Sequence, residues 1–241
     1  MIDFHSHVLP GIDDGSGSIE ESISLIESLK GMGACRIFAT PHFFAGDETA
    51  KSFLQRRDKA YNELVSRYPP ASELVSVGAE IAYYPGVSRM DELRELALFG
   101  TSLVLIEMPP DTWSEYILRE LVTMPVTTGL YPVIAHVERY MDMQSSATLG
   151  RLAESGVLMQ ANASFFLEKK TVKKAMKLLS RGEIHVLGSD CHSIDYRPPR
   201  LRMAYDAIEE KLGRGVLDSM IARSYKLAGL SPASQASRIT L

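Results

Sequence analysis

Seven short apolar runs alternate with segments of helical periodicity along this chain of 241 residues. The runs occupy residues 1–5, 35–42, 73–81, 102–108, 131–137, 156–163 and 183–190. Such alternation favours a parallel sheet, because two parallel strands need a long crossover and a helix supplies it. We expect an α/β fold, a distorted seven-stranded TIM-like (β/α) barrel, with an open doubly wound sheet as the alternative.

The segments between the runs place apolar residues at helical spacing. We expect helices over residues 18–33, 50–68, 114–125, 147–156, 170–182 and 201–230. No interdomain linker interrupts this order, so residues 1–241 are predicted to form a single domain. The C-terminal stretch SPASQASRITL is expected to be a loosely held tail.

Composition excludes several classes of function. No run approaches the roughly 18 apolar residues of a membrane span, and no secretion signal precedes the first strand. We therefore expect a cytoplasmic protein. A net charge of −4 without a lysine or arginine cluster gives no basis for binding nucleic acid. Cys35 and Cys191 lack the spacing of a disulfide framework or a thiolate zinc site.

Polar side chains stand where the predicted strands end. His5 and His7 close the first run on the same face, because residues i and i+2 of a strand point the same way. The later runs end in the same manner, at His42, Glu80, Glu107, His136, Asn162, Asp190 and His192. The carboxyl ends of barrel strands meet at one rim, where barrel enzymes carry their active sites. We therefore expect these side chains to form one cluster.

Each of these residues alone has an ordinary structural explanation, such as a helix cap for Asp190 or a turn for Asp13 and Asp14. Together on one rim they indicate a metal site. Imidazole and carboxylate ligands without thiolate suit manganese, zinc or iron. Nine candidate ligands suggest two or three ions. They are His5, His7, Asp14, His42, Glu80, Glu107, His136, Asp190 and His192.

The charge of such a site points to an anionic substrate. Three divalent ions would outweigh the four ligand carboxylates. Arg139 and Arg197 lie within a few residues of ligand histidines, and a guanidinium matches two phosphate oxygens at once. Phosphate is therefore the expected ligand, attacked in line by a metal-activated hydroxide.

The ordered motifs HSH, TPH, GAE, LIE, AHVERY and SDCH resemble the polymerase and histidinol phosphatase (PHP) superfamily. More narrowly, HSHVLPGIDDGS, ATPH, GAEI, VLIEMP and AHVERY are similar to the bacterial manganese-dependent protein-tyrosine phosphatases encoded with capsule and exopolysaccharide genes. The resemblance covers residues 2 to about 200. It implies a distorted seven-stranded barrel with three metal ions.

The resemblance also implies roles. One ion would be held by His5, His7, Glu80 and Asp190, a second by Glu80, Glu107 and His136, and a third by Asp14, His42 and His192. Arg139 and Arg197 would bind the phosphoryl group. The implied partner is the phosphotyrosine tail of a bacterial tyrosine kinase that controls polysaccharide export, and a homo-oligomer is possible in such a family.

Two departures and three alternatives accompany this hypothesis. Val137 stands where relatives commonly have proline, and Phe43 and Phe44 follow TPH, where they could pack or stack on a substrate ring. A small-molecule phosphoesterase such as a histidinol-phosphate phosphatase would share the metal centre. An amidohydrolase usually carries a bridging lysine where Glu107 stands. A binding module with a structural metal fits poorly, because a closed structural site needs fewer ligands.

Overall fold

The computed structural model describes residues 1–231 and contains nine parallel strands there. They are β1 (Ile2–Ser6), β2 (Arg36–Ala39), β3 (His42–Phe43), β4 (Val75–Val77), β5 (Glu80–Ala82), β6 (Leu103–Glu107), β7 (Tyr131–Ile134), β8 (Leu158–Asn162) and β9 (Val186–Gly188). They pair in the orders β1-β2-β4 and β3-β5-β6-β7-β8-β9. All seven apolar runs therefore contain strands. The expected tail lies outside the described residues, apart from Ser231.

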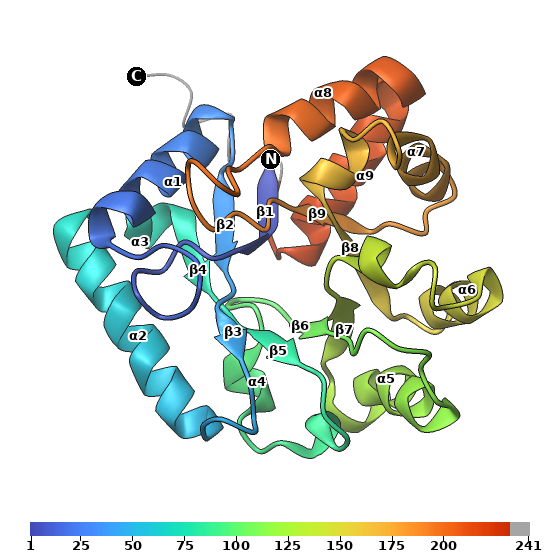
Figure 1. The fold of residues 1–241 in the computed structure, drawn as a ribbon, viewed down its shortest axis with the longest axis horizontal. Helices are drawn as coiled ribbons and strands as arrows, with labels where there is room; N and C mark the ends of the chain where they lie inside the picture. The colour runs from blue at the N-terminus through green and yellow to red at the C-terminus, as the bar shows by residue number, and fades with distance from the viewer. Residues whose placement is uncertain (232–241) are drawn as a thin grey trace.

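Helices surround the strands (Figure 1). The longer ones are α1 (Ile19–Gly31), α2 (Ala50–Arg67), α5 (Glu115–Thr128), α6 (Ser146–Glu154), α7 (Val172–Ser180), α8 (Leu201–Leu212) and α9 (Arg214–Leu227). Short α-helical turns are α3 (Ala71–Leu74) and α4 (Leu93–Leu96), and 3₁₀ turns are η1 (Val87–Arg89), η2 (Val137–Tyr140) and η3 (Ala163–Phe166). No helix within residues 1–231 has both the length and the apolar composition to cross a membrane.

Two of the seven expected strands are each divided into two shorter ones, which gives the nine strands of the structure. The run 35–42 forms β2 and β3, and the run 73–81 forms β4 and β5. Pro41 lies at the first break and has no N–H to donate to a ladder. β2 pairs with both β1 and β4, whereas β3 pairs with β5. His42 and Glu80 therefore begin short strands instead of ending long ones.

The parallel strands form a curled sheet, a half-barrel in outline. Beyond β9 the chain returns to β1, where Ser6 forms a parallel bridge with Cys191. Two backbone hydrogen bonds support this bridge, from Asp190 N to His5 O at 2.8 Å and from His7 N to Cys191 O at 2.9 Å. The first and last strand segments are thus neighbours, which brings residues far apart in the sequence to one edge.

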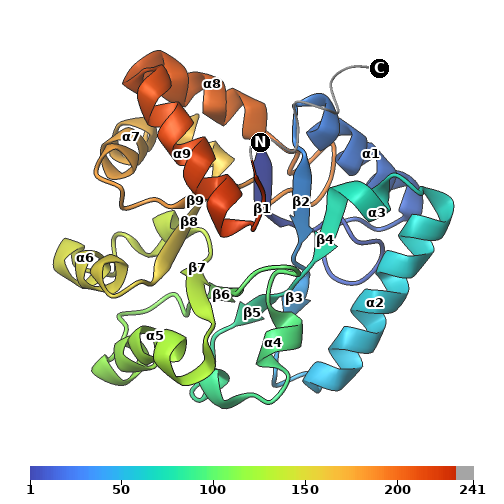
Figure 2. The ribbon, with the colours of Figure 1, turned by 180° about the vertical axis from the view of Figure 1, so that it is seen from behind.

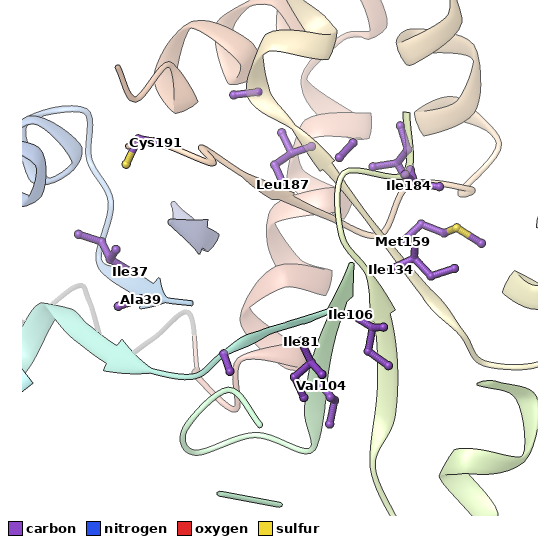
Figure 3. Close-up of a cluster of buried hydrophobic side chains, with 14 of the residues drawn as sticks. Ile37, Ala39, Ile81, Val104, Ile106, Ile134, Met159, Ile184, Leu187 and Cys191 are labelled. Carbon is purple, nitrogen blue, oxygen red and sulfur yellow. The ribbon is translucent and has the colours of Figure 1, made fainter. Parts of the chain in front are cut away.

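Alternate residues of the strands enter two apolar clusters. Ile37, Val104 and Ile106 face the cluster shared with the helices, whereas Phe38, Leu103 and Leu105 face the inner cluster. Figure 3 shows members of the first cluster along the strands. The inner cluster joins side chains of β1, β2, β6, β7 and β9, so the sheet curls around it.

The C-terminal helix covers the inner cluster. Tyr225 of α9 belongs to the same inner cluster as Ile2 and Leu103, the first residues of β1 and β6. The view from behind shows α9 lying across the strands (Figure 2). The amino ends of the strands are therefore closed by packing, which leaves the carboxyl ends for chemistry.

Two helix predictions were wrong at their boundaries. The expected helix 201–230 is two helices, because Gly213 adopts φ 83° and ψ 162° between α8 and α9. The expected end at residue 125 is passed, since α5 continues through Pro125 to Thr128. Gly129 at φ 71° then ends this helix and donates its N–H to Pro125 O.

Candidate metal centre

All nine candidate ligands meet at the carboxyl edge of the strands. Geometry divides eight of them into three groups whose ligand atoms lie within 4.8 Å of one another. The groups are His7, Asp14, His42 and His192; then His5, His7 and Asp190; and then His42, Glu80 and Glu107. His136 joins the third group, with Nε2 at 2.8 Å from Glu80 Oε1 and 3.4 Å from Glu107 Oε1. His7 and His42 each belong to two groups, so the groups are contiguous.

The two histidines of the first strand are arranged to receive a cation. His5 Nδ1 lies 3.1 Å from Gln160 Oε1, and His7 Nδ1 lies 2.7 Å from Asp13 Oδ2. Both oxygens are acceptors, so each Nδ1 carries the proton and a neutral ring presents a bare lone pair at Nε2. The two Nε2 atoms face each other at 3.1 Å. Two facing lone pairs need a cation between or beside them, and a divalent metal fits this donor set.

Glu80 lies at the centre of the cluster, with only 1% of its side chain exposed. Its Oε2 is 3.2 Å from His5 Nε2, 3.4 Å from His7 Nε2 and 3.0 Å from His42 Nδ1. Oε2 and His42 Nδ1 are buried without a hydrogen-bond partner in the described part of the chain. Burial alone would raise the pKa of Glu80, but the surrounding histidines hold it well below its usual range. The carboxylate therefore stays charged and available to cations.

Charge also accumulates on the histidines. Burial works to lower the pKa of His7, yet its hydrogen bond with Asp13 and the nearby carboxylate of Glu80 raise it to about 10. The same balance, with Glu107 and Glu80 as partners, raises the pKa of His136 to about 9. The carboxylates thus hold positive charge at this edge, as protons or as metal ions.

Several positioning residues were missed or misread in the sequence. Asp13 was interpreted as a turn residue, but besides His7 it accepts the backbone N–H groups of Gly15 and His42. Gln160 holds His5 and also accepts the N–H of His136 at 2.7 Å. Its polar side chain within the apolar run LMQAN was the available signal. Such partners orient metal ligands and select their tautomer.

Asp190 is held from several sides. Asn162 Nδ2 donates to Asp190 Oδ2 at 2.7 Å, so the polar end of β8 contributes a supporting group.

Asp190 and His136 have φ values of 51° and 31°, and they are the non-glycine residues with positive φ between residues 1 and 231. Left-handed backbone at such residues is uncommon and costs free energy. The fold therefore accepts strain at two candidate ligands.

Two glycines allow the backbone to approach the ligand histidines. A Cβ on Gly188 would lie 2.5 Å from the Cβ of His5, and one on Gly15 would lie 2.4 Å from the Cβ of His7. Neither distance is tolerable for a larger residue. The neighbouring segments can pack against these candidate ligands because Gly188 and Gly15 have no side chain.

The two predicted phosphate-binding arginines converge on Asp190. Arg197 Nη2 lies 2.6 Å from Asp190 Oδ2 and its Nη1 lies 3.0 Å from His192 Nε2. Arg139 donates to Asp190 Oδ2 at 3.1 Å and to Glu107 Oε1 at 3.3 Å. Both line a cleft of about 410 Å³ beside the ligand cluster, together with Asn162. The cleft thus presents two guanidinium groups to an incoming anion.

The remaining histidine and the two phenylalanines lie apart from the ligand set. His185 precedes β9, and its Nδ1 accepts the backbone N–H of Met159. Phe43 is buried and packs on Phe53, so its role is packing. Phe44 is 43% exposed and stacks on His42, with ring centroids 5.5 Å apart. The sequence could not separate these two aromatic roles.

Comparison with known proteins supplies the family. The model of the family described as capsular polysaccharide synthesis, CpsB/CapC, matches residues 1–226. The chain belongs to the CpsB/CapC family. Within it, the chain is 34% identical over 229 residues to the tyrosine-protein phosphatase CpsB of Streptococcus pneumoniae, covering 88% of this chain and 91% of that protein. It is 29% identical to the tyrosine-protein phosphatase YwqE of Bacillus subtilis, covering 88% and 85%.

Solved structures agree with this CpsB/CapC membership. A crystal structure from work on YwqE of Bacillus subtilis and CpsB of Streptococcus pneumoniae, described as metal-dependent tyrosine phosphatases, superimposes with a TM-score of 0.82. It shares 26% identity and covers 96% of each chain. The hisK structure of Listeria monocytogenes has a TM-score of 0.50 at 14% identity, covering 80% of this chain and 95% of that one. This second likeness shows a common fold alone.

Proposed function

We propose that this chain is a metal-dependent protein-tyrosine phosphatase. One observation carries the proposal: a buried cluster of histidines and carboxylates adjoins a cleft that presents Arg139 and Arg197. Membership of a family with relatives named tyrosine-protein phosphatases supports it. The proposed biological partner is the phosphotyrosine tail of a bacterial tyrosine kinase in capsule or exopolysaccharide synthesis, acted on in the cytoplasm.

The finer architecture is part of the proposal. We regard β2 with β3, and β4 with β5, as two bent strands of a seven-stranded barrel that forms one domain over residues 1–241. The proposed metal ligands are His5, His7, Asp14, His42, Glu80, Glu107, His136, Asp190 and His192, for three ions, with manganese expected. When bound, divalent ions would neutralise phosphoryl oxygens and lower the pKa of water toward neutrality, which supplies the nucleophile.

The chain's own residues perform the other tasks. Arg139 and Arg197 bind and orient the phosphoryl oxygens, and their hydrogen bonds to Asp190 keep both guanidinium groups aimed at one place. Asp13 and Gln160 hold the rings of His7 and His5 with Nε2 toward the cluster. Tyrosine has a pKa near 10, so its phenolate leaves readily and a dedicated general acid is not required.

The proposal is tested by removing metal from the purified protein with a chelator and reloading it with Mn²⁺, Zn²⁺ or Fe²⁺ in turn. We expect no turnover of a phosphotyrosine peptide without metal, recovery with metal, and a kcat/KM for this peptide well above that for histidinol phosphate. Metal content measured on the same samples relates activity to the number of ions. A clear preference for histidinol phosphate would show that the chain is a small-molecule phosphoesterase instead.

A further inference from the structure

A second cavity adjoins the ligand cluster on the other side of Arg139. It has a volume of about 350 Å³ and is lined by Ala82, Tyr83, Glu107, Met108, Pro109, Pro110, Arg139 and Tyr140. Apolar and aromatic groups form its walls, whereas Glu107 and Arg139 give it one charged end. The cleft described above is polar and contains Arg197 and Arg200. Arg139 lines both cavities. A phosphate ester whose phosphoryl group lies beside Arg139 could therefore extend its organic part into either cavity.

Hydrogen bonds hold the apolar walls in place. Tyr83 donates its hydroxyl to Glu120 Oε2 at 2.8 Å. Glu120 also accepts from Gly86 N at 3.1 Å, Ser88 N at 3.1 Å and Ser88 Oγ at 2.7 Å, which fixes the loop that follows Tyr83. This carboxylate is therefore fully used within the fold. Tyr83 is presented as a fixed ring, which reduces the ordering cost of binding against it.

The part of the wall formed by residues 108–110 is held in the same way. Trp113 Nε1 donates to Pro109 O at 3.1 Å, and Met108 N donates to the hydroxyl of Tyr140 at 3.0 Å. Proline restricts its own backbone, so consecutive Pro109 and Pro110 make this wall stiff. A preformed slot with apolar walls and one charged end suits a flat apolar group that carries an anion.

We propose that this slot receives the phenyl ring of phosphotyrosine and that Tyr83 is the residue that selects aryl over alkyl phosphates. This inference rests on the proposed phosphatase function. The phosphoryl group lies toward Arg139 and the ring packs between Tyr83 and Pro109. Both faces of the ring are then buried against apolar surface and shielded from water.

Two exposed aromatic side chains near the cluster are less suited. Phe44 already has its ring stacked on His42. Tyr196 lines the polar cleft but is 89% exposed, so a substrate ring placed on it would lose little contact with water. Tyr83 is partly buried and anchored, so a substrate ring that packs against it meets a fixed surface at a low ordering cost. Tyr140 also lines the slot but is buried, so Tyr83, Phe44 and Tyr196 are the residues varied in the experiment.

Binding of two phosphonates measures the ring contact without the difference in leaving groups between aryl and alkyl substrates. Benzylphosphonate carries the ring and methylphosphonate does not. Calorimetry with the Mn²⁺-loaded protein gives both Kd values. We expect Tyr83→Ala to weaken benzylphosphonate about tenfold, equivalent to about 1.4 kcal/mol, and to leave methylphosphonate within about twofold. Tyr83→Phe keeps the ring and should keep the preference for benzylphosphonate.

Phe44→Ala and Tyr196→Ala are the matched controls, and we expect neither to change the ratio of the two Kd values. Loss of the preference in either control, with Tyr83→Ala unaffected, would place the ring elsewhere and overturn the inference. Equal weakening of both phosphonates by Tyr83→Ala would also overturn it. Wild-type turnover of a phosphotyrosine peptide, measured beside these titrations, separates this failure from a failure of the proposed function.

Discussion

Asp13 Oδ2 lies 2.7 Å from His7 Nδ1, and this pair joins the loop after β1 to the centre of the ligand cluster. The side chain of Asp13 is 5% exposed, and it also accepts the N–H of His42. A neighbouring carboxylate therefore sets the orientation of one ligand and the loop position of another. Asp14, the next residue, instead faces His42 and His192 at 3.4 Å each.

Replacing Asp13 with asparagine tests this relationship. Asn can turn its NH₂ group toward His7 and lacks the charge that stabilises the histidine, so we expect metal affinity to fall about 10- to 100-fold while the fold is retained. Titration calorimetry with Mn²⁺ gives the affinity, and circular dichroism checks the fold. Asp91→Asn, at an exposed position, is the control. Unchanged affinity in Asp13→Asn would show that Asp13 is only a turn residue.

Asp190 and Arg139 should differ in the step that they affect. Asp190→Ala removes a candidate ligand and leaves Arg139 and Arg197 without their shared partner, so we expect turnover of a phosphotyrosine peptide to be abolished. His136→Ala should have the same effect. Arg139→Ala removes a charge-assisted contact worth about 1.5–3 kcal/mol, so KM should rise about 10- to 100-fold with a smaller change in kcat. Full activity in both ligand variants would exclude the metal assignment.

Gly188→Ala should lower both stability and metal affinity, because the added methyl group would clash with His5. The new Cβ would lie 2.5 Å from His5 Cβ and 2.8 Å from Gln160 Nε2, so either β9 or His5 must move. We expect the free energy of unfolding to fall by about 1–3 kcal/mol and metal affinity to fall with it. The matched control is Gly150→Ala in α6, where the new Cβ meets nothing within 4 Å apart from its chain neighbours and the backbone of its own helix. This control should gain about 0.5–1 kcal/mol, because alanine is the better helix former. Equal stability of the two variants would contradict the close approach.

His185 should make stability fall in mild acid. Burial, with Arg223 nearby, lowers the pKa of His185 from 6.5 to about 4. Between these two pH values His185 binds a proton in the unfolded chain and stays neutral in the folded protein, which favours the unfolded state. The free energy of unfolding is therefore unaffected by His185 above pH 6.5 and decreases as pH falls toward 4. Between pH 7.5 and 5.0 we expect His185 to account for about 1–2 kcal/mol of lost stability.

His185→Gln removes the titrating group and keeps an acceptor for the N–H of Met159. Urea unfolding of wild type and variant at both pH values measures the difference in pH dependence, so titration of the other histidines largely cancels. Parallel loss of stability in the two proteins would show that another group is responsible.

The order of elements and the place of the chemistry could be predicted from local patterns. The alternation of runs and helical segments implied parallel strands, and the ends of parallel strands share one edge. His5, Glu107 and Asp190 were recognised because they end apolar runs, and this needs no knowledge of distant contacts. Gly213 was not recognised as a break between helices, because a single glycine is compatible with a continuous helix.

Only the tertiary structure decided which polar residues support which ligands. Gln160 lies 155 residues from His5 in the sequence, yet their side chains meet because β8 and β1 both flank the segment of β9. The division of two strands at Pro41 and near Gly78 depends on which neighbour each half pairs with. The slot beside Tyr83 depends on Glu120, from a helix further along the chain. The amino-acid sequence alone indicated the candidate ligands at the strand ends and their shared edge through local periodicity, whereas the choice of Asp14 over Asp13 rested on the family resemblance. Long-range packing determined their orientation, because side-chain contacts across distant segments leave no local pattern.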